Sequence, residues 1–334
     1  EIPEDGFEAR IDSSLSEGFE YYVKAFATYG DKTVYGNRVS LLSKGCKLSA
    51  WCRELSDIKL EGEHTIPFGW SDGTNGYVIF QNKAVYKYDS ESKSFDRMVG
   101  FPLLGNSGTR FSAVGTGNRQ YVFSDLDRNL YKLDGGKWAV ESATPFYYGS
   151  FGGYYHGYSV SNQIYLLSSY LSQTYKPDNK YWQSRSIMPA TYYSVGGTDL
   201  NGFAYLMDCA KKIVRYNPQD NTWQYIATFP GTFPASAYYF SRYDGKIIGF
   251  SQNNSIYFGF CFDEDASMNW IEKSMWEYNL TTNTWREIED FPQDLSHGRI
   301  FYFTLKGKLY IGHEDSGIYS LYSLDLSRLQ KLIM

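Results

Sequence analysis

Y-N-P-Q-D-N-T-W, residues 216–223, is the segment that recurs most clearly along this chain. Each copy joins a stretch ending in Tyr or Leu to a stretch opening with an aromatic residue. The connection is rich in Asn, Asp, Gly and Pro, the residues that favour tight hairpin turns. The segment therefore predicts a repeated β-hairpin. Its other copies are Y-D-S-E-S-K-S-F at 88–95, L-D-G-G-K-W at 133–138, Y-K-P-D-N-K-Y-W at 175–182 and Y-N-L-T-T-N-T-W at 278–285.

The aromatic residue that opens the second strand of each hairpin recurs at a nearly constant interval. Successive members lie 44, 43, 44, 41 and 62 residues apart. Two further apolar stretches precede each hairpin, so one unit holds four strands in about 44 residues, the period of a propeller blade. The chain is therefore predicted to be all-β, with a six-bladed β-propeller over residues 44–334. The six aromatic residues are Trp51, Phe95, Trp138, Trp182, Trp223 and Trp285.

The two ends of this repeat array predict how the ring closes. The last repeat stops after three strands, whereas Trp51 has no strands before it. Residues 49–56 are therefore expected to supply the outer strand of the last blade, because an unpaired sheet edge recruits other chains. Residues 329–334 are the alternative occupants of that position. Each Trp among the six aromatic residues is expected to be buried.

The 62-residue interval before Trp285 needs a separate explanation. We take Asp244-Gly245 as a turn and Ile247-Ile248-Gly249-Phe250 as the second strand of the fifth blade. The extra residues then form an insertion over about 251–274, between the second and third strands.

These units resemble kelch repeats, in which a Gly-bounded strand precedes a Tyr-Asp/Asn hairpin with a Trp. The Gly-Gly pair that usually ends the second kelch strand is absent, replaced for example by Phe80-Gln81 and Ser168-Ser169. The resemblance implies the propeller fold. It also implies two classes of function, because kelch propellers include non-catalytic binding proteins as well as copper-dependent galactose oxidases and sialic-acid epimerases.

The first 43 residues form a separate part. Residues 19–42 alternate polar and apolar side chains around a Gly30-Asp31 turn. They resemble the last two strands of a fibronectin-type-III-like module, so residues 1–43 are predicted to be part of such a module. The resemblance implies a surface protein of glycan-foraging bacteria, at the cell surface or in the periplasm. An outer-membrane lipoprotein is expected, anchored through an N-terminus missing from this chain, which begins Glu1-Ile2-Pro3.

Composition disfavours several classes of partner. The formal net charge is −5, which offers no basic surface for a nucleic acid. No apolar run is long enough to span a membrane. The four cysteines include no C-x-x-C pair, so neither a zinc site nor any other cofactor is expected. Cys46 and Cys52 form a small loop disulfide or remain independent thiols. Asp263-Glu264-Asp265 lacks an EF-hand pattern, and no metal site is predicted.

Propeller topology places the connections between blades on one face of the disc. Most of the His and Arg residues that could bind a ligand fall on this face. Arginine forks bind carboxylates, and aromatic faces pack against sugar rings, so a ligand site is predicted at the mouth of the central channel. In the alternative interpretation, the aromatic residues plug the channel and the arginines are solvated. The predicted site residues are Phe68, Arg110, Tyr154, His156, Tyr192, His297 and Arg299.

Three functions fit these residues. The first is a non-catalytic extracytoplasmic protein that binds a glycan or a protein partner through one loop face. The second is a carbohydrate-active enzyme of the sialic-acid epimerase or galactose oxidase kelch type, so the sequence leaves open whether the chain is an enzyme. The third is a docking platform. No catalytic motif, such as G-x-S-x-G or H-E-x-x-H, occurs in the chain.

Overall fold

The structure is a computed structural model in which 14 ranges of the chain are described. They are residues 20–42, 51–61, 67–80, 82–102, 111–116, 119–124, 126–145, 155–168, 172–189, 194–232, 246–262, 270–288, 291 and 299–325.

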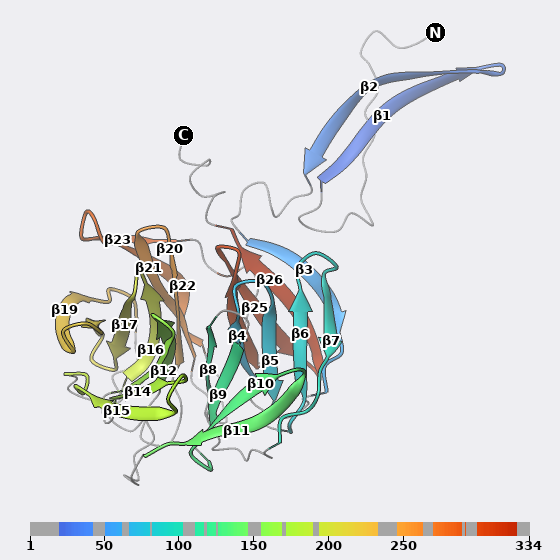
Figure 1. The fold of residues 1–334 in the computed structure, drawn as a ribbon. Coiled ribbons are helices and arrows are strands. Elements are labelled where there is room, and N and C mark those ends of the chain that lie inside the picture. The colour runs from blue at the N-terminus through green and yellow to red at the C-terminus, as the bar shows by residue number, and fades with distance from the viewer. Residues whose placement is uncertain are drawn as a thin grey trace.

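The chain forms a six-bladed β-propeller, and each blade is a four-stranded antiparallel sheet (Figure 1). Blade 1 contains β4 (Pro67–Ser71), β5 (Gly76–Phe80), β6 (Val85–Asp89) and β7 (Ser94–Arg97). Blade 2 contains β8 (Phe111–Thr116), β9 (Arg119–Ser124), β10 (Asn129–Asp134) and β11 (Lys137–Ala143). Blade 3 contains β12 (His156–Val160), β13 (Gln163–Leu167), β14 (Ser172–Lys176) and β15 (Tyr181–Arg185).

The second half of the ring follows the same order. Blade 4 contains β16 (Ser194–Leu200), β17 (Phe203–Asp208), β18 (Lys212–Asn217) and β19 (Thr222–Thr228). Blade 5 contains β20 (Lys246–Gln252), β21 (Ser255–Phe262), β22 (Trp270–Asn279) and β23 (Thr284–Glu287). Blade 6 contains β24 (Ile300–Leu305), β25 (Lys308–Asp315), β26 (Ile318–Leu324) and, from the other end of the propeller sequence, β3 (Trp51–Ile58).

Blade 6 closes the ring. Its outer strand β3 pairs antiparallel with β26, and Trp51 lies opposite Leu324. Figure 1 shows β3, in blue, beside the red strands of the chain's C-terminal part. The sequence spacing predicts this pairing for 49–56. The alternative occupants, residues 329–334, lie outside the described part of the chain.

The recurring hairpin segment is explained by contacts between its two strands. In four blades the Tyr that ends the third strand lies opposite the aromatic residue that opens the fourth, as Tyr216 lies opposite Trp223. These two rings have centroids 4.8 Å apart. Asn221 takes a left-handed φ of 56° at the turn, which Asn tolerates better than most residues. Its Oδ1 accepts a hydrogen bond of 2.9 Å from the Tyr216 hydroxyl. The Y-N-…-N-x-W pattern thus fixes both turn and register.

The prediction that the Trp residues among the six aromatic residues are buried is wrong for four of the five. Trp51 is 2% exposed, but the other four are only partly buried, as is Phe95. The fourth strand is the outer edge of a blade, so its side chains have packing partners on their inner side only. Trp51 is enclosed because Phe260 and Phe291 pack against it.

The strand assignment in blade 5 is also wrong. Ile247–Phe250 belongs to β20, the innermost strand, and the predicted insertion over 251–274 contains the whole of β21. The turn that separates the first two strands is Asn253-Asn254, not Asp244-Gly245. Both β20 and β21 are short apolar stretches after a turn signal, so either satisfies the pattern of a second strand.

Residues 20–42 form a hairpin of β1 (Glu20–Tyr29) and β2 (Lys32–Leu42), which is a sheet of its own. Its apolar side chains are exposed, with Phe26 at 67% and Tyr35 at 63%. The hairpin was predicted, whereas the fibronectin-type-III-like module stays a prediction from sequence. No helix of the described residues is long and apolar enough to cross a membrane.

Candidate functional site

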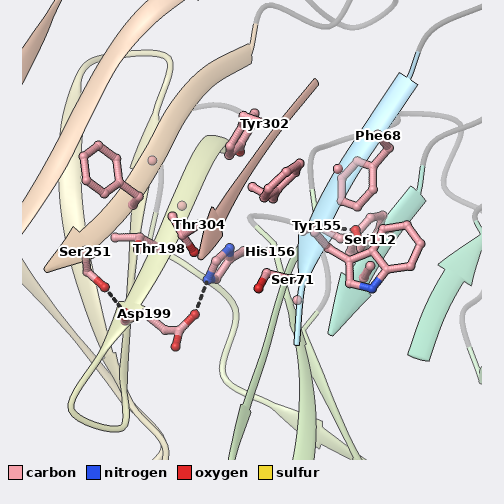
Figure 2. Close-up of a pocket in the computed structure, with 18 residues that line it drawn as sticks. Phe68, Ser71, Ser112, Tyr155, His156, Thr198, Asp199, Ser251, Tyr302 and Thr304 are labelled. Carbon is pink, nitrogen blue, oxygen red and sulfur yellow. Dashed lines mark hydrogen bonds and ion pairs between the residues drawn. The ribbon is translucent and has the colours of Figure 1, made fainter. Parts of the chain in front are cut away.

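The innermost strands of the six blades surround a central cavity of about 210 Å³ (Figure 2). All six of them, β4, β8, β12, β16, β20 and β24, contribute to its wall. The cavity is therefore a property of the closed ring, and residues far apart in sequence meet in it.

Small residues let the innermost strands converge on this cavity. Gly69, Gly197 and Gly249 occupy the same register position in blades 1, 4 and 5. A Cβ atom on Gly69 would lie 2.3 Å from the Tyr302 carbonyl oxygen of the next blade. A Cβ on Gly249 would lie 2.7 Å from the Gly197 carbonyl oxygen. Neighbouring backbones thus approach more closely than any side chain at these positions would permit.

His156 is the buried polar group of the cavity wall. It opens β12, is 6% exposed, and its ring stacks on Tyr158 with an interplanar angle of 14°. A Cβ on Gly197 would lie 2.8 Å from its Cγ, so the missing side chain makes room for the imidazole. Its Nε2 has no hydrogen-bond partner among the described residues. Burial lowers the pKa of His156 to about 4, so the ring is neutral at pH 7.

Asp199 faces His156 from β16, with its Oδ1 3.9 Å from the His156 Nε2. Figure 2 shows this pair on one side of the cavity and Phe68 on the other. Half of the Asp199 side chain (51%) is open to the cavity. Protein nevertheless surrounds the carboxyl group, and the loss of bulk water raises its pKa to about 6. Asp199 therefore changes charge close to neutral pH.

Aromatic side chains form another part of the wall. Trp70 lies between Phe68 and Tyr77, with ring centroids 6.5 and 5.2 Å away. Its indole N–H donates a 3.0 Å hydrogen bond to the Gln120 Oε1 of blade 2, which fixes the ring. Tyr302 is a further aromatic lining residue, from β24. Phe68 and Tyr302 are partly exposed and provide apolar faces beside the polar pair, whereas Trp70 is buried behind Phe68 in the core.

Hydroxyl groups line the rest of the cavity and join the blades. The Ser112 hydroxyl donates a 2.7 Å hydrogen bond to the Tyr155 carbonyl oxygen, linking blades 2 and 3. The Ser251 hydroxyl donates one of 2.5 Å to the Asp199 carbonyl oxygen, linking blades 5 and 4. The backbone that carries the Asp199 carboxyl group is thereby held in place.

Only some of the predicted site residues that the structure describes line the cavity. Phe68 and His156 line the cavity. Arg299 is not a lining residue: its Nη1 donates a 3.1 Å hydrogen bond to the Oε2 of the buried Glu314. The remaining four lie outside the described residues, so their place at the channel mouth stays a prediction. They are Arg110, Tyr154, Tyr192 and His297.

Sequence reasoning missed Asp199, although a signal for it exists. Aligning the blades on the Tyr of the second strand brings one residue from each innermost strand to the same position. Five of these residues are Gly, Ser or Thr, and the sixth is the only acid. The set is Ser71, Gly115, Ser159, Asp199, Ser251 and Thr304.

The cavity provides chemistry for a small polyhydroxylated ligand. A neutral imidazole, a carboxyl group and several hydroxyls offer hydrogen bonds, and the aromatic rings offer apolar faces. In the described part of the chain, no group of three or more His, Cys, Asp and Glu side chains is arranged to hold a metal ion.

Comparison with known proteins adds information on the fold. No protein-family model matches the chain, and no curated protein matches it. Among solved structures, 1235 chains resemble it, so the architecture does not discriminate between functions. One of them, described as the structure of YjhT, aligns with a TM-score of 0.59 and 11% sequence identity. The alignment covers 82% of this chain and 95% of that one, and it shows a shared fold alone.

Proposed function

We propose that this chain is an extracytoplasmic binding protein that takes a carbohydrate in the central cavity. The observation that carries the proposal is the His156 Nε2, which is buried, faces the cavity and lacks a hydrogen-bond partner among the described residues. Buried polar groups are nearly always paired, so an unpaired one in a cavity wall points to a ligand.

A sugar ring suits the mixture of groups around His156. Its hydroxyls both donate and accept hydrogen bonds, as required to satisfy a neutral imidazole and the Asp199 carboxyl group. Its C–H faces pack against partly exposed aromatic rings such as Phe68 and Tyr302. The cavity of about 210 Å³ is smaller than a site for a drug-sized molecule. It therefore fits one sugar residue, either free or at the end of a chain.

A glycan is favoured over a protein partner because the site is narrow and concave. Protein interfaces bury about 800 Å² on each partner, which a cavity of this size does not provide. The placement at the bacterial cell surface or in the periplasm, with a lipid anchor, rests on the resemblance of residues 19–42 to a fibronectin-type-III-like module.

Binding can be tested by screening the protein on a glycan array and measuring the best ligand by calorimetry. Asp199→Asn and His156→Gln should each weaken binding about tenfold, because each removes a hydrogen bond to a charged or buried group. Tyr225→Ala serves as a control, since Tyr225 is 54% exposed on an outer strand. Binding that survives both cavity substitutions would move the site elsewhere, and the absence of any saccharide ligand would refute the function.

Catalysis is a second candidate, favoured by the 3.9 Å approach of the His156 Nε2 to Asp199. A carboxyl group whose pKa is about 6, beside a neutral imidazole, can exchange protons near neutral pH. An epimerase would use such a pair to remove a proton from a sugar carbon and return one. Incubating the bound sugar in D₂O and following its C–H signals by NMR separates the two functions, because a binding protein leaves every signal intact.

A further inference from the structure

A second and larger hollow lies between blades 3 and 4, away from the central cavity. It has a volume of about 430 Å³ and is lined by the hairpin turns and strand ends of the two blades. We call it the inter-blade groove. Its lining residues include two cations, Lys176 and Arg185, and two aromatic side chains, Tyr165 and Phe203.

Lys176 breaks the rule that the repeat follows in the other five blades. The residue after the third-strand Tyr or Leu is Asn or Asp elsewhere, as in Asn217 and Asn279. The Asn217 Oδ1 accepts a 3.0 Å hydrogen bond from the Gln219 N–H, and this bond stabilises the turn. A lysine side chain has no acceptor and cannot make that bond. Departures from a local rule of this kind are expected at functional sites.

Arg185 supplies a second cation at a fixed place. Its Nε donates a 2.7 Å hydrogen bond to the Thr174 Oγ1, and its guanidinium lies 5.7 Å from the centre of the Tyr165 ring. Every blade has a Tyr at the position of Tyr165. In blades 1 and 5 the hydroxyl of this Tyr donates to a carboxylate, that of Asp72 or Glu277. Blade 3 places an arginine there instead, as blade 4 does with Arg215 beside Tyr205.

Neither cation of the inter-blade groove is neutralised by a carboxylate. Among the described residues, no ion pair joins an Asp or Glu to the Lys176 ammonium or the Arg185 guanidinium. The acids at the two hairpin turns, Asp178 and Asp220, are engaged by the side-chain amides of Asn162 and Asn217. Among the described residues, the groove therefore presents two positive charges without counter-ions.

The rest of the groove is lined by side-chain amides and, at one end, by a glycine. Gln163, Asn201 and Gln219 contribute side chains that both donate and accept hydrogen bonds. Gly202 adopts a φ of 82°, and a Cβ added to it would lie 3.3 Å from the Val160 Cγ2. The glycine keeps this end of the groove open.

We propose that the inter-blade groove is a second binding site, and that it takes a saccharide bearing a carboxylate. The planar guanidinium of Arg185 binds a carboxylate through two parallel hydrogen bonds, with Lys176 as a supporting charge. The amides bind ring hydroxyls, and Phe203, whose ring centre lies 4.8 Å from the Arg215 guanidinium, adds an apolar wall. This site is independent of the carbohydrate site proposed in the central cavity.

The test compares two ligands that differ in the carboxylate alone, a glucuronate oligosaccharide and its neutral glucose counterpart, by calorimetry on the full chain. The glucuronate should bind, and raising the salt concentration should weaken it, whereas the glucose oligosaccharide should not bind this groove. Lys176→Asn gives blade 3 the residue that blade 4 has and should weaken glucuronate binding about tenfold. Arg185→Lys keeps the positive charge but removes the planar guanidinium that forms two parallel hydrogen bonds. It should therefore also weaken glucuronate binding.

Three controls keep the proposal falsifiable. Lys137→Asn removes an equally positive charge from the exposed hairpin of blade 2 and should leave binding unchanged. An excess of the neutral glucose oligosaccharide should also leave glucuronate binding unchanged, which separates failure of this site from failure of the central cavity. Equal binding of a glutamate tripeptide would show a charge effect without saccharide recognition. That result, or no effect of both groove substitutions, would overturn the proposal.

Discussion

The layers between blades and the wall of the central cavity follow different rules. Between blades, the same residue type recurs around the ring. A Tyr stands on the second strand of all six blades, and an aromatic residue opens every fourth strand. On the innermost strands, which surround the central cavity, the residue type at an equivalent position differs from blade to blade. In one blade that residue is an acid, Asp199. The positions of the Tyr residue are Tyr77, Tyr121, Tyr165, Tyr205, Tyr257 and Tyr310.

This difference separates residues that build the fold from residues that serve a site. A repeated position meets the same packing demand in each blade, so one residue type satisfies all of them. Unrepeated residues such as His156 and Asp199 place polar groups beside a cavity, where the packing that recurs from blade to blade does not require them. The comparison therefore predicts that repeated positions control stability, whereas unrepeated ones control binding and pH dependence.

The largest expected effect is at a repeated position. Trp51→Ala should lower the free energy of unfolding by about 3–5 kcal/mol, because Trp51 is enclosed by Phe260 and Phe291 where the ring closes. Trp223→Ala should cost about half as much, since that ring is partly exposed. Its contacts are Tyr216 and a 2.9 Å hydrogen bond from its indole N–H to the Ser186 carbonyl oxygen. Urea unfolding measures both, and equal costs would contradict the burial difference.

A smaller effect is expected from His156 on the pH dependence of stability. Its pKa is about 4 in the folded chain and about 6.5 when unfolded. As pH falls from 6.5 to 4, the unfolded chain binds a proton that the folded chain does not bind. The free energy of unfolding should therefore fall by about 3 kcal/mol over this window. His156→Gln should remove that loss, as measured by urea unfolding at pH 7 and pH 4.

Asp199 acts in the opposite direction and provides the matched variant. Its folded-state pKa of about 6 lies above the usual 3.8, so the folded chain binds a proton first as pH falls below 6. That uptake stabilises the fold at acid pH. Asp199→Asn should therefore make the loss of stability between pH 7 and pH 4 steeper than in the unsubstituted chain. A pH profile that neither substitution changes would show that both groups are hydrated like surface side chains.

Much of the fold could be predicted from the sequence because the hairpin segment is repeated. The Tyr and Trp positions give strand order and register, and the in-phase Trp51 gives the strand that closes blade 6. The strand assignment in blade 5 was wrong because Ile247–Phe250 is bulky and apolar, as the second strands of the other blades are. Gly249 alone marks its true place, since it allows the close approach to Gly197.

Less of the candidate site could be predicted, because its geometry depends on how the blades meet. His156 and Phe68 were singled out as residues near the start of an innermost strand, and both line the cavity. Asp199 lies at the other end of its strand, so no argument about the channel mouth includes it. The inter-blade groove needs residues from two blades, and only alignment of the repeats reveals that Lys176 departs from them.

The smallest expected effect tests whether Lys176 belongs with the repeated or the unrepeated residues. The turns of blades 3 and 4 have the same length and the same proline, Pro177 or Pro218. Lys176→Asn should therefore let the new side chain accept a hydrogen bond from the Asp178 N–H, as Asn217 accepts one from Gln219. A gain of about 0.5 kcal/mol in the free energy of unfolding is expected.

The reverse substitution in blade 5 completes this test. Asn279 accepts hydrogen bonds of 2.9 and 3.0 Å from the Thr281 and Thr282 N–H groups. Asn279→Lys should lose both and lower the free energy of unfolding by about 1 kcal/mol. If Lys176→Asn were also destabilising, Lys176 would support the fold of blade 3, and its departure from the repeat would need no ligand. A gain in blade 3 with a loss in blade 5 would mean that the chain keeps Lys176 at a cost to stability, as expected for a residue retained for binding.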